Sequence, residues 1–164
     1  IFLIFMLVPG ILYGRYIAAG IFIIAALSDM LDGYLARKNN LVTNFGKFMD
    51  PMADKLLVSS ALICFVQLKL LPAWIVIIII AREFIVSGFR LLASDNGVVI
   101  AAGWTGKIKT NVQMIMIVML IINLDNPFMN VVEQIFIYAA VVMTIVSMVD
   151  YLYHNRSVFK DKKE

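Results

Sequence analysis

Long apolar segments, separated by short polar connections, are the feature that most constrains the fold of this chain. Hydrophobic residues make up 62% of its 164 residues, and charged residues make up only 15%. A soluble domain of this length has too little interior to bury so much apolar surface, so we expect lipid to surround it. We therefore predict an all-α fold, a polytopic membrane helix bundle that forms the single domain 1–164.

The apolar segments predict six transmembrane helices, of which the first is truncated. Residues 1–8 would span only about 12 Å as a helix, far less than the roughly 30 Å of a hydrocarbon core. We interpret them as the back half of a membrane helix rather than a signal peptide, because no basic region or small-residue cleavage site is visible. The other predicted helices cover residues 16–37, 45–70, 72–94, 105–123 and 130–153.

Four aspartates lie in this apolar background, near the facing ends of the second and third predicted helices. Asp29 and Asp32 are three residues apart and Asp50 and Asp54 are four apart, so each pair projects from one helix face. The polar residues between the two helices predict a turn, which would make the helices antiparallel and bring the pairs together. Because an unpaired carboxylate in a low-dielectric medium costs several kcal/mol or more, we expect a functional site here.

Oxygen donors of this kind suit a hard divalent cation. Converging carboxylates repel one another unless cations lie between them, and Mg²⁺ binds in such all-oxygen sites, usually together with substrate phosphates. The alternative is that the aspartates only form hydrogen bonds between membrane helices. That alternative fits one aspartate well, but it fits four in this arrangement poorly. Gly33 and Ala36 leave one side of the helix bare, so a phosphorylated ligand could approach the backbone.

The same stretch resembles a known signature. It matches D-x2-D-G-x2-A-R-x8-G-x3-D-x3-D, the motif of the CDP-alcohol phosphotransferase family, at every fixed position. The resemblance implies a metal-dependent enzyme in which Asp29, Asp32 and Asp50 bind two ions of Mg²⁺ or Mn²⁺. It implies that Asp54 is the general base and also a metal ligand. The nucleotide-binding residues that it implies are Asp32, Gly33, Ala36, Arg37 and Gly46.

A second polar cluster lies on the fourth predicted helix and at the start of the fifth. Arg82, Glu83 and Arg90 belong to the fourth helix, and Lys107 and Lys109 to the fifth. One interpretation is an interhelical ion pair, with arginines that reach the membrane surface and lysines that fix the topology. The other is a phosphate site, because the planar guanidinium of arginine binds phosphate well. No role is assigned to Glu83.

These segments narrow the resemblance to the phosphatidylglycerophosphate synthase branch of the family. The similar segments are Ala81-Arg82-Glu83-Phe84, Ser87-Gly88-Phe89-Arg90 and Gly106-Lys107-Ile108-Lys109-Thr110. The resemblance implies transfer of the phosphatidyl group of CDP-diacylglycerol to glycerol 3-phosphate, with release of CMP. Because this acceptor is an anion, its phosphate needs cations. The candidates for binding it are Arg82, Arg90, Lys107 and Lys109.

Basic residues predict the topology, since they gather on the cytoplasmic side of membrane proteins. The side that would be cytoplasmic holds Lys38, Lys47, Lys107, Lys109, Arg156, Lys160, Lys162 and Lys163, and the opposite side holds only Arg15 and Lys69. We therefore expect a multi-pass protein of a bacterial cell membrane, with an active site that faces the cytoplasm. It should contact membrane lipid and no nucleic acid, and the family resemblance implies a homodimer.

Two other functions stay open. A sister enzyme could use the same aspartates with another acceptor, such as inositol phosphate, serine or phosphatidylglycerol. Only the cations of the fourth and fifth helices discriminate among these acceptors. The other possibility is a cation or proton transporter with carboxylates at the midplane of the membrane. Against transport, the glycines, alanine and arginine of the motif have no role in it, and the carboxylates lie near the membrane surface.

Overall fold

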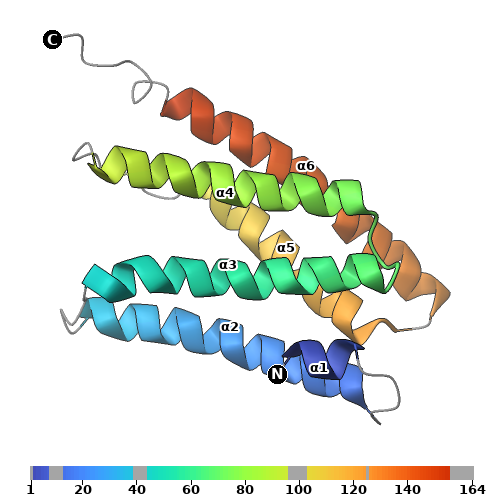
Figure 1. The fold of residues 1–164 in the computed structure, drawn as a ribbon. Helices are drawn as coiled ribbons and strands as arrows, with labels where there is room; N and C mark the ends of the chain where they lie inside the picture. The colour runs from blue at the N-terminus through green and yellow to red at the C-terminus, as the bar shows by residue number, and fades with distance from the viewer. Residues whose placement is uncertain (1, 8–12, 39–43, 96–102, 125, 156–164) are drawn as a thin grey trace, which may run out of the picture. The chain divides into compact units, whose positions relative to one another are not determined.

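Six α-helices make up the described part of the chain, and no strand occurs there (Figure 1). The computed structural model describes residues 2–7, 13–38, 44–95, 103–124 and 126–155, without the side chains at 29, 30, 32–38, 44–51, 53, 54, 92, 94 and 95. The helices are α1 (Phe2–Leu7), α2 (Gly14–Lys38), α3 (Asn44–Gln67), α4 (Ala73–Asp95), α5 (Trp104–Ile122) and α6 (Pro127–His154). The predicted all-α fold class is confirmed.

The helix ends follow from local sequence. The side chain of Asn126 accepts a hydrogen bond from the backbone N–H of Phe128 at 3.0 Å, and Pro127 occupies the first turn. This cap starts α6 three residues before the predicted position 130, because Asn and Pro favour a helix N-terminus. At the end of α3, Lys69 adopts a positive φ of 58°, and the N–H of Leu70 returns to the carbonyl of Phe65 at 2.8 Å. That closure ends α3 at Gln67 rather than at the predicted residue 70.

The chain divides into two compact units, and the predicted single domain stays a prediction. The first unit comprises Ile1–Pro72 and Ile117–Leu124, and the second Ala73–Met116 and Asp125–Glu164. In the first unit α1 packs on α2 and α3, and the ring centroids of Phe2 and Phe22 lie 5.8 Å apart. Helices α2 and α3 lie side by side and run antiparallel (Figure 1). The end of α2 and the start of α3 are therefore at the same end of this hairpin.

In the second unit α4 packs against α6. Val86, Phe89 and Tyr151 form a buried cluster, and the rings of Phe89 and Tyr151 meet edge to face with centroids 5.7 Å apart. The start of α5 is joined to the end of α6, because Thr105 Oγ1 donates a hydrogen bond to Asp150 Oδ2 at 2.6 Å. These contacts hold one end of the three helices together.

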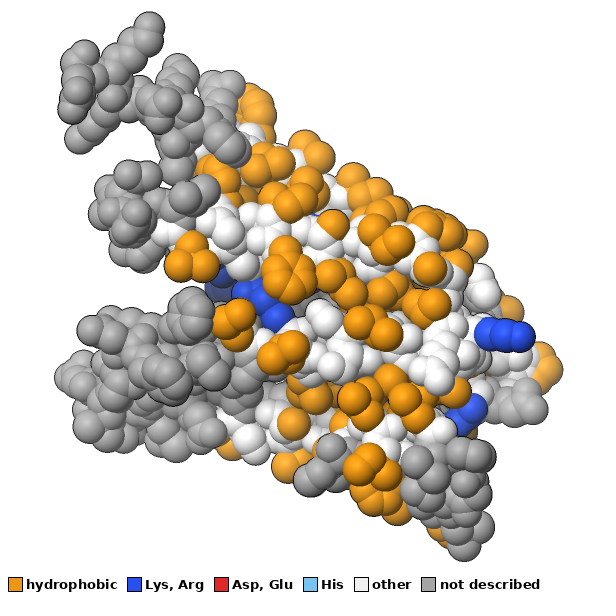
Figure 2. All heavy atoms as spheres, in the orientation of Figure 1, with side chains coloured by type: hydrophobic (Ala, Val, Ile, Leu, Met, Phe, Trp, Pro, Cys, Tyr) orange, Lys and Arg blue, Asp and Glu red, His pale blue; other side chains and the backbone are white. Residues whose placement is uncertain are grey.

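The surface of the helices has the character of a membrane protein. Within the described residues, α5 and α6 are long and apolar enough to cross a membrane, and the apolar segments Gly14–Ser28 and Lys55–Gln67 are shorter. Large hydrophobic side chains such as Ile77 and Phe84 are more than half exposed. Figure 2 shows hydrophobic side chains spread over the visible face. Exposed apolar surface of this extent fits a bundle that lipid surrounds.

Candidate active site

The aspartate motif lies on the α2–α3 hairpin. Asp29 and Asp32 belong to the last turns of α2, and Asp50 and Asp54 to the first half of α3. Because the two helices are adjacent and antiparallel (Figure 1), both pairs belong to one end of the hairpin, as the predicted turn required. The side chains of all four aspartates lie outside the described residues, so their roles stay predictions. As a donor set, four carboxylates on two neighbouring helices fit a hard divalent cation.

The predicted nucleotide-binding residues share the same hairpin. Gly33, Ala36 and Arg37 follow Asp32 in α2, and Gly46 lies in the first turn of α3. Their side chains are also outside the described part of the chain. The backbone alone shows that the sequence motif is carried by the ends of two paired helices.

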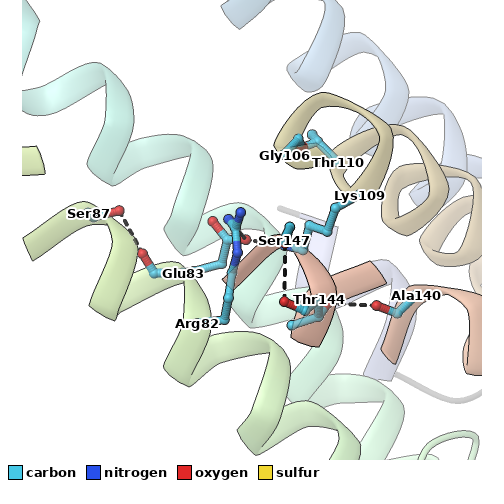
Figure 3. A network of polar contacts seen from close by, with 9 residues as sticks. All are labelled: Arg82, Glu83, Ser87, Gly106, Lys109, Thr110, Ala140, Thr144 and Ser147. Carbon is cyan, nitrogen blue, oxygen red and sulfur yellow. Dashed lines mark hydrogen bonds and ion pairs between the residues drawn. The ribbon is translucent and has the colours of Figure 1, made fainter. Parts of the chain in front are cut away.

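The second polar cluster is described in full, and Glu83 is at its centre. Arg82 Nη1 donates a hydrogen bond to Glu83 Oε1 at 3.2 Å, and Lys109 Nζ of α5 contacts the same carboxylate oxygen (Figure 3). Ser87 Oγ, one turn further along α4, donates to the backbone carbonyl of Glu83 at 2.6 Å. One carboxylate oxygen therefore contacts two cations, one from α4 and one from α5.

Both cations are withdrawn from solvent. The exposed fraction of the side chain is 2% for Lys109, 9% for Arg82 and 23% for Glu83. A buried charge without a counter-charge is strongly destabilising, so Glu83 stabilises both cations where they stand. Among the contacts that the structure describes, two cations therefore meet one carboxylate.

Arg82 has a donor without a partner among the described residues. Its Nε is buried and has no hydrogen-bond partner within the part of the chain that the structure describes. Its Nη2 lies beside Gly106 of α5, where an added Cβ would be 3.6 Å away. A buried donor without a partner costs free energy, and an anionic ligand would satisfy it. By contrast, the buried hydroxyls of Thr144 and Ser147 bond to carbonyls of their own helix at 2.6 and 3.1 Å.

The other two predicted phosphate-binding cations lie on aromatic rings. The guanidinium carbon of the exposed Arg90 lies 5.7 Å from the ring centroid of Tyr151. Lys107, also exposed, has its ammonium 5.0 Å from the ring centroid of Trp104. The four cations thus form two classes, a buried pair joined by Glu83 and an exposed pair on aromatic rings. The interpretation as an interhelical ion pair holds for Glu83 with Lys109, and a phosphate site on the same residues remains compatible with it.

Helix α6 contributes residues to which the sequence assigned no role. Tyr151 receives Arg90 on its ring, and Asp150 bonds to Thr105 and pairs with His154, whose Nδ1 lies 3.0 Å from Asp150 Oδ1. The sequence does contain a signal, because Thr144, Ser147 and Tyr151 recur at helical spacing in a mostly apolar segment. Such a polar stripe indicates a face turned toward the protein rather than toward lipid.

Comparison with known proteins points to the same family as the sequence motif. A family model described as CDP-alcohol phosphatidyltransferase matches residues 1–146. The chain is 50% identical over 143 residues to a CDP-diacylglycerol–glycerol-3-phosphate 3-phosphatidyltransferase of Bacillus subtilis, which covers 85% of this chain and 74% of that protein. Proteins of the same name from Haemophilus influenzae and Rickettsia felis are 42% and 34% identical. The Haemophilus alignment covers 84% of this chain and 76% of the relative, and the Rickettsia alignment covers 89% and 87%. Two mycobacterial relatives at 41% identity are covered over 65% of their length.

Proposed function

The chain belongs to the CDP-alcohol phosphatidyltransferase family, and from this membership we propose that it transfers the phosphatidyl group of CDP-diacylglycerol to glycerol 3-phosphate. The products are phosphatidylglycerophosphate and CMP. The observation that carries the choice of acceptor is the buried pair of cations Arg82 and Lys109, together with the Nε of Arg82, which has no hydrogen-bond partner among the described residues. An acceptor with its own phosphate needs such a site, whereas a neutral alcohol does not. The names of the relatives agree with this acceptor.

The aspartates are assigned as ligands of the divalent metal ions that the reaction needs. Asp29, Asp32 and Asp50, with Asp54 beside them, would hold two divalent ions, Mg²⁺ or Mn²⁺. Their place at one end of the α2–α3 hairpin and their all-oxygen donor set support this assignment. The bound metal would supply charge neutralisation at the pyrophosphate and at the departing CMP.

The nucleotide is assigned to the same hairpin. Gly33 and Ala36 offer a bare stretch of helix to the cytidine part of the substrate, and Arg37 and Gly46 flank it. Asp32 belongs to this set as well as to the metal ligands. The family motif supports these roles residue by residue.

In the transfer step, the hydroxyl oxygen of the acceptor bonds to the phosphorus of the phosphatidyl group. The bond from that phosphorus to the bridging oxygen of the pyrophosphate breaks, and CMP leaves with that oxygen. Asp54 accepts the proton of the attacking hydroxyl as general base. A phosphoryl-type transition state depends mainly on positioning and charge neutralisation, and the carboxylates and cations of this chain are suited to both.

The four cations have two roles in this proposal. Arg82 and Lys109 bind the acceptor phosphate directly, because they are buried and fixed. Arg90 and Lys107 are exposed, so they attract the anion toward the site through their long-range field. Inositol phosphate would satisfy the same cations, whereas serine would leave them without a phosphate.

The reaction is proposed to take place at the cytoplasmic face of a bacterial cell membrane, in a homodimer. The distribution of lysine and arginine in the sequence and the bacterial origin of the relatives support the location. The homodimer rests on the family resemblance alone.

A transfer assay with a panel of acceptors tests the function. The purified protein is incubated with labelled CDP-diacylglycerol and Mg²⁺, and each of glycerol 3-phosphate, inositol phosphate, serine and phosphatidylglycerol is supplied in turn. We expect CMP release that depends on glycerol 3-phosphate, together with labelled phosphatidylglycerophosphate. Transfer to another acceptor in its place would contradict the proposal.

A further inference from the structure

We propose that Glu83 is a positioning residue of the acceptor site. Its Oε1 fixes Arg82 and Lys109 so that the Nε–Nη2 edge of Arg82 stays available for the acceptor phosphate, and Gly106 keeps that edge open. This inference rests on the proposed function, because it names how the same site is built. It gives a role to a carboxylate that a phosphate-binding site would otherwise be expected to avoid.

The first step of the argument concerns charge. A carboxylate beside a phosphate site weakens anion binding unless it is outnumbered by cations. Among the described contacts Glu83 meets two cations, since Arg82 and Lys109 both contact its Oε1. The side chains of Arg82 and Lys109 are also less exposed than that of Glu83, so both cations are held away from water. An anion that binds there meets cations that are already held in place, and it does not have to order them.

The second step concerns the geometry of Arg82. A guanidinium carries five N–H donors in a rigid fork. Glu83 engages Nη1 at 3.2 Å, and the buried Nε has no partner in the described part of the chain. Nε and Nη2 form the side edge of the fork, which presents two parallel N–H groups and matches two oxygens of a phosphate. By holding Nη1, Glu83 fixes the direction in which this edge points.

The third step concerns α5. Gly106 and Lys109 are three residues apart, so they share one face of α5, and this face meets the cluster on α4 (Figure 3). A Cβ at residue 106 would lie 3.6 Å from Arg82 Nη2, an ordinary contact that the fold tolerates but that occupies the space beside the edge. Helix α5 therefore presents a bare backbone next to the guanidinium and an ammonium one turn later.

A purely structural ion pair between α4 and α5 is the competing explanation. It predicts that loss of Glu83 lowers the stability of the protein and changes the Michaelis constants for both substrates to the same extent. A positioning role predicts a selective change in the Michaelis constant for glycerol 3-phosphate, because CDP-diacylglycerol is assigned to the α2–α3 hairpin. The two explanations therefore differ in kinetics rather than in stability.

Glu83→Gln is the main test, because glutamine keeps the shape of the side chain and an accepting oxygen but not the charge. With both substrates varied in turn on folded protein, we expect the KM for glycerol 3-phosphate to rise about 10- to 100-fold, because Arg82 is held less firmly toward the phosphate and a charge-assisted hydrogen bond to the phosphate is worth about that factor. The KM for CDP-diacylglycerol should stay within about two-fold, the scatter expected where no such bond is lost. An unchanged KM for glycerol 3-phosphate, or equal rises in both constants, would overturn the inference.

A double-mutant cycle tests whether Glu83 acts through Arg82. Arg82→Lys keeps the positive charge but removes the Nε–Nη2 edge. If Glu83 works by aiming that edge, adding Glu83→Gln to Arg82→Lys should change the KM for glycerol 3-phosphate little further. Two effects that multiply fully would show that the residues act independently, and the inference would be wrong.

A matched glycine pair covers the case in which Glu83→Gln does not fold. Gly106→Ala places a methyl group beside Arg82 Nη2, whereas a Cβ at Gly88 of α4 meets nothing within 4 Å. We expect Gly106→Ala to raise the KM for glycerol 3-phosphate several-fold and Gly88→Ala to leave it unchanged. Equal KM values for glycerol 3-phosphate in the two variants would contradict the inference that Gly106 keeps the Nε–Nη2 edge of Arg82 open.

Binding of inorganic phosphate separates this inference from the proposed function. Phosphate should raise the thermal stability of the wild type, and Glu83→Gln and Gly106→Ala should each weaken that effect. A wild type that binds phosphate but does not use glycerol 3-phosphate would refute the proposed acceptor only. An active wild type whose response to phosphate survives both substitutions would refute the inference only.

Discussion

The ammonium of Lys109 contacts the carboxylate of Glu83, although the two residues are 26 positions apart and belong to different helices. The contact joins α4 to the start of α5 inside a bundle whose other buried side chains are mostly apolar. It is the best-buried ion pair in the described part of the chain, and the same carboxylate also holds Arg82.

Lys109 should contribute to stability far more than its neighbour Lys107. Lys109→Ala removes the cation that α5 places against Glu83, and breaking a buried ion pair by removing one partner typically costs about 3–5 kcal/mol of unfolding free energy. Lys107→Ala removes an exposed ammonium, so its effect should stay within about 0.5 kcal/mol. Thermal unfolding of both variants in the same detergent measures the difference. Equal melting temperatures would contradict the burial of Lys109.

The aspartates should be needed for activity and not for folding. Asp29→Asn, Asp32→Asn or Asp50→Asn removes one negative oxygen donor from the predicted metal site, so each should abolish transfer. A chelator should have the same effect on the wild type, and added Mg²⁺ or Mn²⁺ should reverse it. Asp150→Asn is the matched control on α6 and should remain active. Wild-type activity that persists in excess chelator would refute a metal-dependent reaction.

Asp54 should separate chemistry from binding. Its proposed role arises only in the attack step, so Asp54→Asn should lose turnover while CDP-diacylglycerol remains bound. Equilibrium binding of labelled CDP-diacylglycerol and single-turnover transfer, measured on the same preparation, test this. A variant that keeps its maximal rate and loses only affinity would make Asp54 a binding residue.

Arg82 and Arg90 should differ in how strongly they affect the acceptor. Arg82→Ala removes a buried donor, so the KM for glycerol 3-phosphate should rise about 10- to 100-fold. Arg90→Ala removes an exposed guanidinium that lies on Tyr151, so the rise should be smaller and should shrink as salt is added. Kinetics at low and high ionic strength distinguish the two. A larger, salt-independent effect at Arg90 would reverse the assignment of roles.

The helices could be predicted from the sequence because long apolar segments and their proline and glycine boundaries are local features. The fourth helix, predicted at 72–94, is found at Ala73–Asp95. The fifth, predicted at 105–123, is found at Trp104–Ile122. The antiparallel α2–α3 pair followed from the polar turn between them in the same way.

The pairing of side chains could not be predicted, because it depends on how each helix is rotated about its axis. The sequence supplied Arg82, Arg90, Lys107 and Lys109 as equivalent cations, and a shift of one residue around a helix decides which of them is buried. The hydrogen bond from Thr105 to Asp150 could not be predicted for the same reason, because it joins two helices whose contact is not encoded in any local sequence pattern.

Trp104 also provides a measure of depth. It is 78% exposed at the first residue of α5, and tryptophan favours the boundary between lipid and water. Lys109 lies five residues further along α5, a rise of about 7–8 Å along the helix axis. If α5 crosses the membrane with Trp104 at its surface, the proposed acceptor would have to pass below that surface to meet Lys109. The proposed site would then need a hydrated path inside the protein, and the attacked phosphorus of the lipid would have to be reached from that path.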